Sequence, residues 1–152
     1  MYRRYVTFDA QLRTALQAIH PKPSAAEARA IIDVARLAAA ADNKTDLSEA
    51  VVLLAVSRIV CELAGVDEIP DAKAMIDGHR LREIGEQLVP TGARELAFAS
   101  AYLVMVQDLD VTKEEQQLAN ALGDALVLDA ARTKQLSSEM EALVRRARGG
   151  SS

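Results

Sequence analysis

Two clusters of acidic side chains stand out in this sequence, and each lies where a turn meets a predicted helix. Their members are Asp42, Asp46 and Glu49 in the first cluster, and Asp108, Asp110, Glu114 and Glu115 in the second. Carboxylate oxygens are the ligands that hard divalent cations prefer, and Ca²⁺ takes six to eight of them. Because no Cys or His accompanies these acids, softer metals are disfavoured. The sequence therefore predicts a candidate site for Ca²⁺ or another hard divalent cation, with the ligands Asp42, Asp46, Glu49, Asp108, Asp110 and Glu115.

Helix capping is an alternative role for some of the same acids. Asp46 and Thr112 are residue types that cap a helix start, and Glu49 and Glu115 follow three positions later. In such a capping box, each side chain satisfies a backbone N–H group of the first helical turn. Capping gives a weaker explanation for Asp42, Asp108 and Asp110, because these residues precede the caps. Both roles remain open, since a capping carboxylate keeps lone pairs for a cation.

Neither cluster has the spacing of known calcium loops or catalytic motifs. An EF-hand loop needs Gly at position six and Glu at position twelve, but counting from Asp42 gives Leu47 and Leu53. Counting from Asp108 fails in the same way. The only histidines, His20 and His79, belong to no Glu-x-x-His motif, and the sequence has no phosphate-binding glycine loop or nucleophile elbow. We therefore expect a protein that is not an enzyme.

Helical patterns must position these acids. The composition favours helices with an aliphatic core, because half of the residues are apolar while there are only three Tyr, two Phe and no Trp. We expect helices over Asp9–His20, from Ser24, over Asp46–Gly65, weakly over 71–88, over Gly92–Val106 after Thr91 as N-cap, from Thr112, and from Asp129 to Arg148. The short run Tyr5–Phe8 is a weak strand candidate.

An internal repeat links the two acidic clusters. Asp108 follows Asp42 by 66 positions, and Glu115 follows Glu49 by the same 66. At this offset the apolar stripes also coincide, with Val52, Val56 and Val60 meeting Leu118, Leu122 and Leu126. Two copies indicate one fold built from related halves, because a solenoid needs about three or more units. We predict an all-α, compact bundle of seven or eight helices with an internal two-fold helix-loop-helix repeat. Residues 1–148 form a single domain, and residues 149–152 form a flexible tail.

This pattern resembles the TerB-like family, which is named for bacterial tellurite resistance. The signature is a helix ending in Ala-Asp-Gly, a few further residues, and an acidic residue in the next helix start, and it occurs twice. The copies here are Ala41–Glu49 and Gln107–Glu115. Asn43 replaces the glycine of the first copy and tolerates a positive φ angle, whereas Leu109 in the second copy does not. The resemblance covers about residues 24–147.

The resemblance implies a cytoplasmic, all-helical protein of stress and metal-oxyanion resistance. It also implies divalent-cation binding by the acidic clusters and protein partners in membrane-associated stress complexes. The alternative is a metal-free interaction scaffold. In that case Tyr102 and Met105, or the 71–88 region, would present an apolar groove; the alternative is that these stripes are part of the core, which is the more common role.

Charge and apolar runs set further expectations. A net charge of −4 disfavours nucleic acid as a partner, because phosphate binding needs a basic face. Two short basic stretches stand apart from this balance. The stretch Tyr2–Tyr5 suits phosphate or lipid headgroups, and Arg145, Arg146 and Arg148 complement the negative end of the last helix.

Cys61 is the only cysteine, so we expect a buried thiol without a disulfide. We expect no transmembrane span.

Overall fold

The computed structural model describes residues 2–40, 47–67, 78–106 and 112–149. Seven helices lie in these ranges: α1 (Tyr2–Ile19), α2 (Ala25–Ala40), α3 (Leu47–Ala64), α4 (Gly78–Gln87), α5 (Thr91–Val106), α6 (Lys113–Ala125) and α7 (Ala130–Gly149). These described ranges contain no strand, so the predicted all-α class is confirmed. None of the described helices is long and apolar enough to cross a bilayer.

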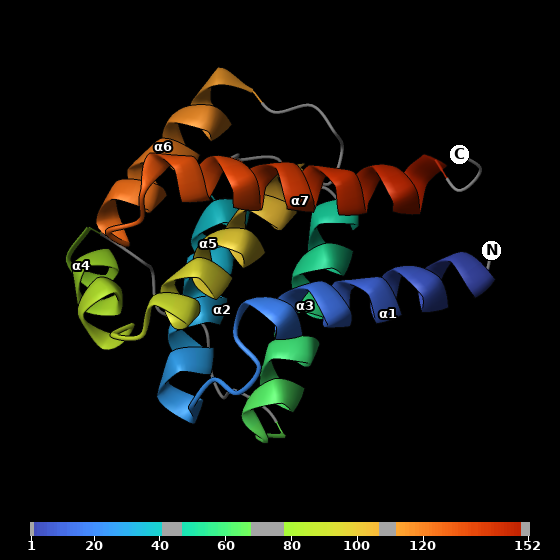
Figure 1. The fold of residues 1–152 in the computed structure, drawn as a ribbon, viewed down its shortest axis with the longest axis horizontal. Helices are drawn as coiled ribbons and strands as arrows, with labels where there is room; N and C mark the ends of the chain where they lie inside the picture. Colours follow the sequence, from blue (N-terminus) through green and yellow to red (C-terminus); the bar gives the residue numbers. More distant parts are fainter. Residues whose placement is uncertain (1, 41–46, 68–77, 107–111, 150–152) are drawn as a thin grey trace.

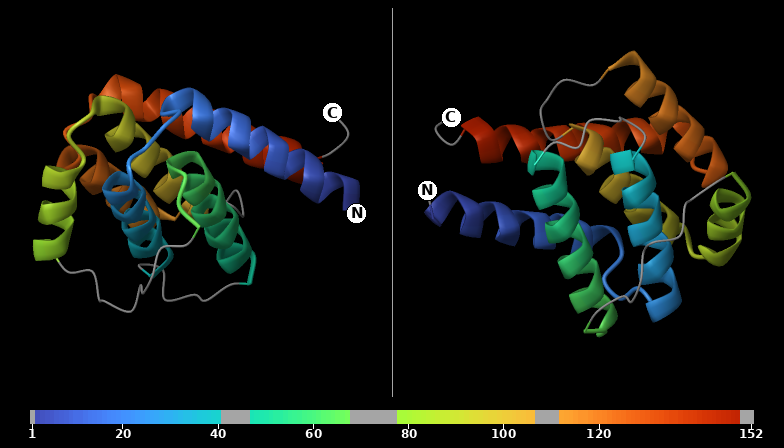
Figure 2. Two further views of the ribbon diagram at one scale, coloured as in Figure 1. Left: turned by 90° about the horizontal axis from the view of Figure 1, so that it is seen from below. Right: turned by 180° about the vertical axis from the view of Figure 1, so that it is seen from behind.

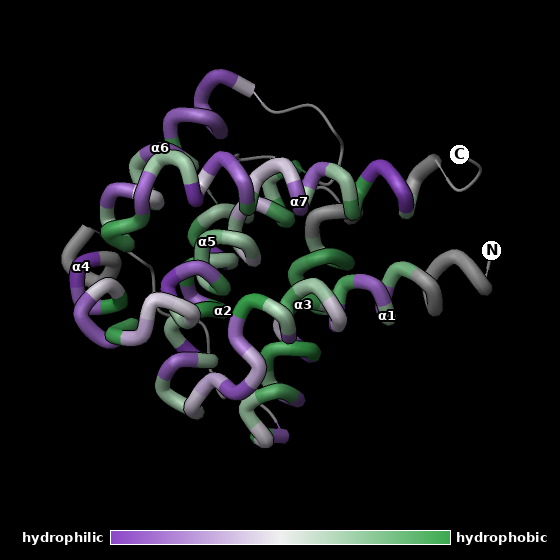
Figure 3. Tube along the Cα trace, viewed as in Figure 1, coloured by the Kyte–Doolittle hydropathy of each residue, from purple (hydrophilic) through white to green (hydrophobic). Residues whose placement is uncertain are grey.

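Helix α5 is the centre of the molecule. It packs across α2 on one side and against α7 on another, while α3 lies beside α2 (Figures 1 and 2). Every residue from Leu96 to Val106 is buried, which is expected for a helix that is apolar on all sides. Apolar residues concentrate in α2, α3 and α5, whereas the outer turns of α6 and α7 are hydrophilic (Figure 3).

A bidentate ion pair joins α5 to the start of α7. Arg132 donates from Nε to Oε2 of Glu95 over 2.8 Å and from Nη2 to Oε1 over 3.1 Å. The side chains of Arg132 and Glu95 are 31% and 15% exposed, so this pair is better shielded from water than the Arg13–Glu62 and Arg58–Asp9 pairs. Two parallel hydrogen bonds between a guanidinium and a carboxylate fix the relative orientation of the two groups as well as their distance. The pair therefore orients α7 on α5.

Two helix starts have the predicted capping boxes. At α2, the Glu27 N–H donates to Ser24 Oγ over 3.1 Å, and the Ser24 N–H donates to Glu27 Oε1 over 3.0 Å. At α6, Thr112 and Glu115 make the same reciprocal pair. The final helix starts after Asp129, whose carboxylate accepts the Ala131 N–H over 3.3 Å. These starts agree with the sequence because a cap depends only on neighbouring residues.

Helix α1 differs from the prediction. It begins at Tyr2, so Asp9 lies inside the helix and is not its N-cap, and the strand candidate Tyr5–Phe8 is helical. The buried residues Leu12 and Leu16 continue a stripe at four-residue spacing back to Phe8, which also packs on the core. Packing of this stripe extends the helix past the residue that resembled a cap.

Helix starts keep the 66-residue offset of the sequence, although the ends of α3 and α6 are 125 − 64 = 61 positions apart. Helices α2 and α5 each have 16 residues and begin at positions 25 and 91, and α3 and α6 begin at positions 47 and 113. Burial follows the same register, because Val56 and Leu122 are fully buried, and Val60 and Leu126 are buried as well.

Candidate functional site

The described residues contain only part of the predicted acidic site. Asp42, Asp46, Asp108 and Asp110 lie outside the described residues, and Glu49 lies in the first turn of α3. Glu115 is the one predicted ligand whose side chain is described. Within the described ranges, no group of three His, Cys, Asp or Glu side chains comes close enough together to hold a metal ion.

Glu115 has a capping role. Its side chain is buried, with 6% exposure, and Oε1 accepts the Thr112 N–H over 3.0 Å. In return, its own N–H donates to Thr112 Oγ1 over 3.1 Å. The neighbouring Glu114 is exposed. Capping therefore accounts for the burial of Glu115.

A buried tyrosine lies where α5 meets α7. Tyr102 is 3% exposed, and its hydroxyl donates to Glu141 Oε1 over 2.6 Å. Burial raises the pKa of Tyr102, and the hydrogen bond and negative charge of Glu141 raise it further. Ser137 lowers this pKa through a hydrogen bond, and the charge of Glu115 raises it slightly. The phenol is therefore held in its neutral form, as a donor to Glu141.

Tyr102 and Met105 form no groove and belong to the core, which is the more common role of such apolar stripes. Both side chains are buried in the core, with exposures of 3% and 2%. In the 71–88 region, the described residues Ile84 and Leu88 are also fully buried. Sequence periodicity identified these positions as apolar, and the structure shows that neighbouring helices cover them.

The helix ends that flank the two acid-bearing segments lie on one side of the molecule. The last turns of α2 and α5 and the first turns of α3 and α6 all lie on this side (Figures 1 and 2). The segment after α2 carries Asp42 and Asp46, and the segment after α5 carries Asp108 and Asp110. The described helix ends on either side of both acid-bearing segments therefore lie on the same side of the molecule.

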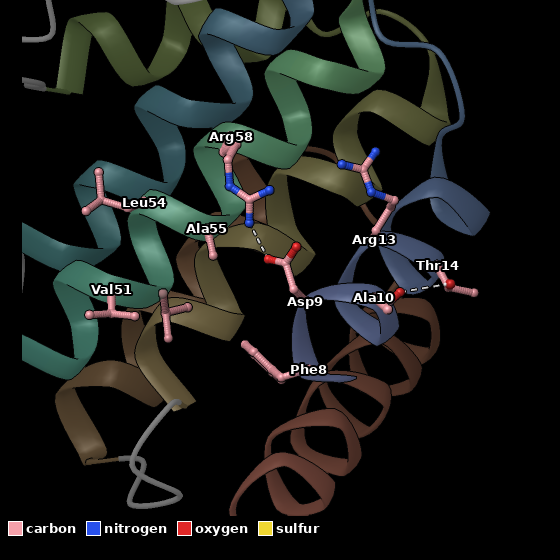
Figure 4. A pocket seen from close by; sticks show the side chains of 10 residues that line it. Phe8, Asp9, Ala10, Arg13, Thr14, Val51, Leu54, Ala55 and Arg58 are labelled. Carbon is pink, nitrogen blue, oxygen red and sulfur yellow. Dashed lines mark hydrogen bonds and ion pairs between the residues drawn. The ribbon is translucent and has the colours of Figure 1, made fainter. Parts of the chain in front are cut away.

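An open groove of about 890 Å³ lies between α1 and α3. Its lining is mostly apolar and consists of Phe8, Asp9, Ala10, Arg13 and Thr14 from α1, and Val51, Val52, Leu54, Ala55 and Arg58 from α3. Leu54 is 69% exposed and Val51 is 49% exposed. Figure 4 shows these two side chains on the α3 wall and Phe8 on the opposite α1 wall. The groove thus presents apolar surface from two helices to solvent.

Ion pairs lie at one end of this groove. Arg58 pairs with Asp9 across the two helices (Figure 4), and Arg13 pairs with Glu62. Arg58 also reaches Glu62 over 3.5 Å. All four side chains are more than one-third exposed, so the pairs contribute little to stability. Two arginines and two carboxylates balance in charge, and the groove therefore suits an apolar group better than an ion.

Sequence reasoning missed this groove, although α3 carries a signal of it. The Val52, Val56 and Val60 stripe already accounts for the buried face of α3. Val51 and Leu54 are additional apolar residues on other faces of the same helix. Some helices have more apolar residues than a single buried face requires. Such a helix either lies in the centre of the core or exposes an apolar patch to solvent.

Among the described side chains, His20 forms no catalytic arrangement. His20 follows α1, and its Nε2 lies 3.0 Å from Oε1 of Glu27, the same oxygen that accepts the Ser24 N–H. This contact ties the end of α1 to the start of α2. His79 lies in the first turn of α4. Cys61 is buried, as expected.

No protein-family model, curated protein or solved structure matches this chain.

Proposed function

We propose that this chain is a non-enzymatic, TerB-like stress-response protein that binds a protein partner in the groove between α1 and α3. The observation that carries the proposal is the open apolar groove, in which Leu54 and Val51 face solvent opposite Phe8. Apolar patches rimmed by polar residues commonly mark interaction sites. The paired charges at the rim add orientation rather than affinity.

The matching helix starts support the TerB-like part of the proposal. Two helix-loop-helix units with the same 66-residue offset, each with acids between its helices, are the layout that the resemblance implies. In this proposal the protein acts in the cytoplasm, in a tellurite-related stress assembly that associates with the membrane.

An amphipathic helix is the partner element that best fits the groove. Two helices that form the walls of a groove commonly receive a third helix, whose apolar residues recur every three or four positions. Val51, Leu54 and Ala55 have this spacing on the α3 wall. Such a partner helix would cover the apolar area that α3 leaves exposed.

Leu54→Asp tests the groove. A photo-crosslinker placed at position 51 should capture one discrete partner in tellurite-treated cells, and Leu54→Asp should abolish this product because it places a charge on the apolar wall. The same substitution should fail to restore tellurite tolerance to cells that lack the protein.

Val89→Asp is the matched control, because Val89 is 68% exposed and lies outside the groove. It should leave both the crosslink and tellurite tolerance unchanged. A crosslink that survives Leu54→Asp, or that Val89→Asp also abolishes, argues against binding in the groove.

A hard divalent cation at the acidic clusters is the second candidate function. It is favoured because the helix ends that flank both acid-bearing segments lie on one side of the molecule (Figure 2). Carboxylates of Asp42, Asp46, Asp108 and Asp110 would supply oxygen ligands of the kind Ca²⁺ prefers. Glu115 is occupied with capping and would contribute at most its remaining lone pairs.

Thermal unfolding with Ca²⁺, Mg²⁺, Mn²⁺ and Zn²⁺ tests this second candidate. A cation at 100 times its Kd should raise the free energy of unfolding by about 2.7 kcal/mol, because it binds only the folded state. Asp42→Asn with Asp108→Asn should abolish the effect, whereas Asp67→Asn with Asp124→Asn, at exposed positions, should preserve it. No stabilisation at millimolar cation would leave a metal-free scaffold.

A further inference from the structure

Charge is distributed unevenly along this chain. No Asp or Glu precedes Asp9 and none follows Glu141, yet these two ends contain Arg3, Arg4, Arg145, Arg146 and Arg148. The whole chain has 18 basic and 22 acidic residues, so removal of these five arginines leaves 13 basic against 22 acidic. The remainder of the protein is therefore strongly acidic, and its two ends are purely basic.

The fold brings the two basic ends together. Helices α1 and α7 pack against each other, and the first turn of α1 and the last turn of α7 extend side by side beyond the other helices (Figures 1 and 2). Arg3 and Arg4 lie in the first turn of α1, and Arg145 and Arg146 are exposed near the end of α7. We call residues 2–5 and 145–148 the basic tip. More than 130 positions of sequence separate its two parts.

We propose that the basic tip binds the anionic headgroups of a lipid bilayer. Clusters of four to eight Lys or Arg on helices are attracted to acidic lipids, and the tip has five. Tyr2 and Tyr5 flank Arg3 and Arg4 in the sequence, and tyrosine favours the boundary between headgroups and acyl chains. This contact is separate from the groove and does not depend on its proposed partner.

A flat bilayer fits this charge distribution better than nucleic acid does. A membrane surface needs to touch only the tip, and repulsion from acidic groups farther away than the Debye length of about 8 Å is largely screened at physiological salt. A long polyanion that continued past the tip would meet the acidic remainder of the protein. Nucleic-acid binding also relies on basic residues spread along a face or groove.

Vesicle co-sedimentation tests the proposal with the whole chain. The protein should sediment with equimolar phosphatidylserine and phosphatidylcholine vesicles at about 0.1 M salt, and not with phosphatidylcholine alone. Salt at about 1 M should release it, because the Debye length falls to about 3 Å. Arg145→Gln with Arg146→Gln should weaken partitioning about 25-fold, or about five-fold for each arginine near the surface.

Matched variants separate the tip from general charge effects. Arg29→Gln with Arg82→Gln removes the same charge from exposed positions on α2 and α4 and should leave partitioning within about two-fold of wild type. Leu54→Asp should also leave it unchanged, so failure of the groove proposal and failure of this one give different results. Circular dichroism should show that all variants fold.

Three results would overturn the proposal. The first is equal sedimentation with neutral and anionic vesicles, or none with either. The second is an equal loss of partitioning in the tip variant and in the Arg29 and Arg82 variant. The third is tighter binding to a double-stranded DNA oligonucleotide than to anionic vesicles at the same salt, with the tip variant abolishing it, which would assign the tip to nucleic acid.

Discussion

At the scale of single residues, Tyr102 is the described side chain whose chemistry the fold changes most. It is nearly fully buried in α5 and donates to Glu141 on α7 over 2.6 Å. A buried phenol without a partner would cost about 1–3 kcal/mol, so the hydrogen bond offsets this cost. Burial and the charge of Glu141 both disfavour the phenolate and raise the pKa of Tyr102.

Tyr102→Phe should therefore lower the free energy of unfolding at neutral pH. It should also reduce the loss of this free energy as the pH rises into the alkaline range. At neutral pH we expect a loss of about 1–2 kcal/mol in the free energy of unfolding, because the hydrogen bond to a carboxylate disappears. The folded pKa lies above the unfolded value of about 10, so this stabilisation is fully present below that pH and is lost as pH rises towards the folded pKa.

Urea unfolding at neutral pH and above pH of about 10 measures both effects. The difference between wild type and Tyr102→Phe should shrink as the pH rises. A difference that stays constant over this range would show that the phenol titrates in the same way in the folded and unfolded chain.

At the scale of elements, two helices end in the same hydrogen-bond pattern with different residues. After α3, Gly65 has φ of 74°, its N–H donates to Glu62 O over 3.1 Å, and the Val66 N–H donates to Cys61 O over 3.0 Å. After α6, Val127 has φ of 55°. Its N–H donates to Asp124 O over 3.1 Å, and the Leu128 N–H donates to Gly123 O over 2.9 Å, which repeats the pattern. Both are Schellman motifs, which favour glycine at the left-handed position.

Val127→Gly should stabilise the protein by about 1 kcal/mol. The left-handed conformation strains a β-branched residue, and Val127 is 76% exposed, so glycine relieves strain without loss of buried area. The greater freedom of glycine in the unfolded chain offsets part of this gain. The midpoint of urea unfolding measures the change.

Gly65→Val is the reciprocal control. No atom lies within 4 Å of a Cβ at Gly65, so any loss comes from the backbone alone. We expect a destabilisation of about 1–2 kcal/mol. If both substitutions change stability in the same direction, left-handed strain does not explain the two helix ends.

At the scale of the whole molecule, one junction fixes three helices. His20 at the end of α1 contacts Glu27, which caps α2, and its ring lies against Gly92 in the first turn of α5. A Cβ at Gly92 would lie 2.7 Å from His20 Nδ1 and 3.3 Å from the Ile19 carbonyl oxygen. The absence of a side chain at position 92 therefore lets α1 approach α5.

Gly92→Ala should destabilise the protein by about 1–2 kcal/mol, although alanine has the higher helix propensity. The new methyl group must displace the His20 ring from Glu27. In a His20→Ala background the same substitution should cost much less, because the ring is gone, and the coupling should be at least about 0.5 kcal/mol. An equal cost in both backgrounds would exclude a steric conflict with His20.

Local chemistry made much of the fold predictable. The Ser24 and Thr112 capping boxes, the Gly65 helix end and the Asp129 start depend on residues within one or two turns, and all appear as expected. The start of α1 was missed, because packing of Leu12 and Leu16 overrides the cap-like Asp9. Of the candidate acidic site, only the capping role of Glu115 is visible among the described side chains, and its cation role stays a prediction.

The sequence by itself determined the helical class and the helix starts set by capping boxes, because these follow from periodicity and short-range hydrogen bonds. Only the tertiary structure decided that Tyr102 and Met105 are covered, that Val51 and Leu54 are not, and that the first turn of α1 and the last turn of α7 lie at one end of the molecule. Which face of a helix is covered, and which ends meet, depends on contacts between segments far apart in the chain. Local pattern does not encode those contacts.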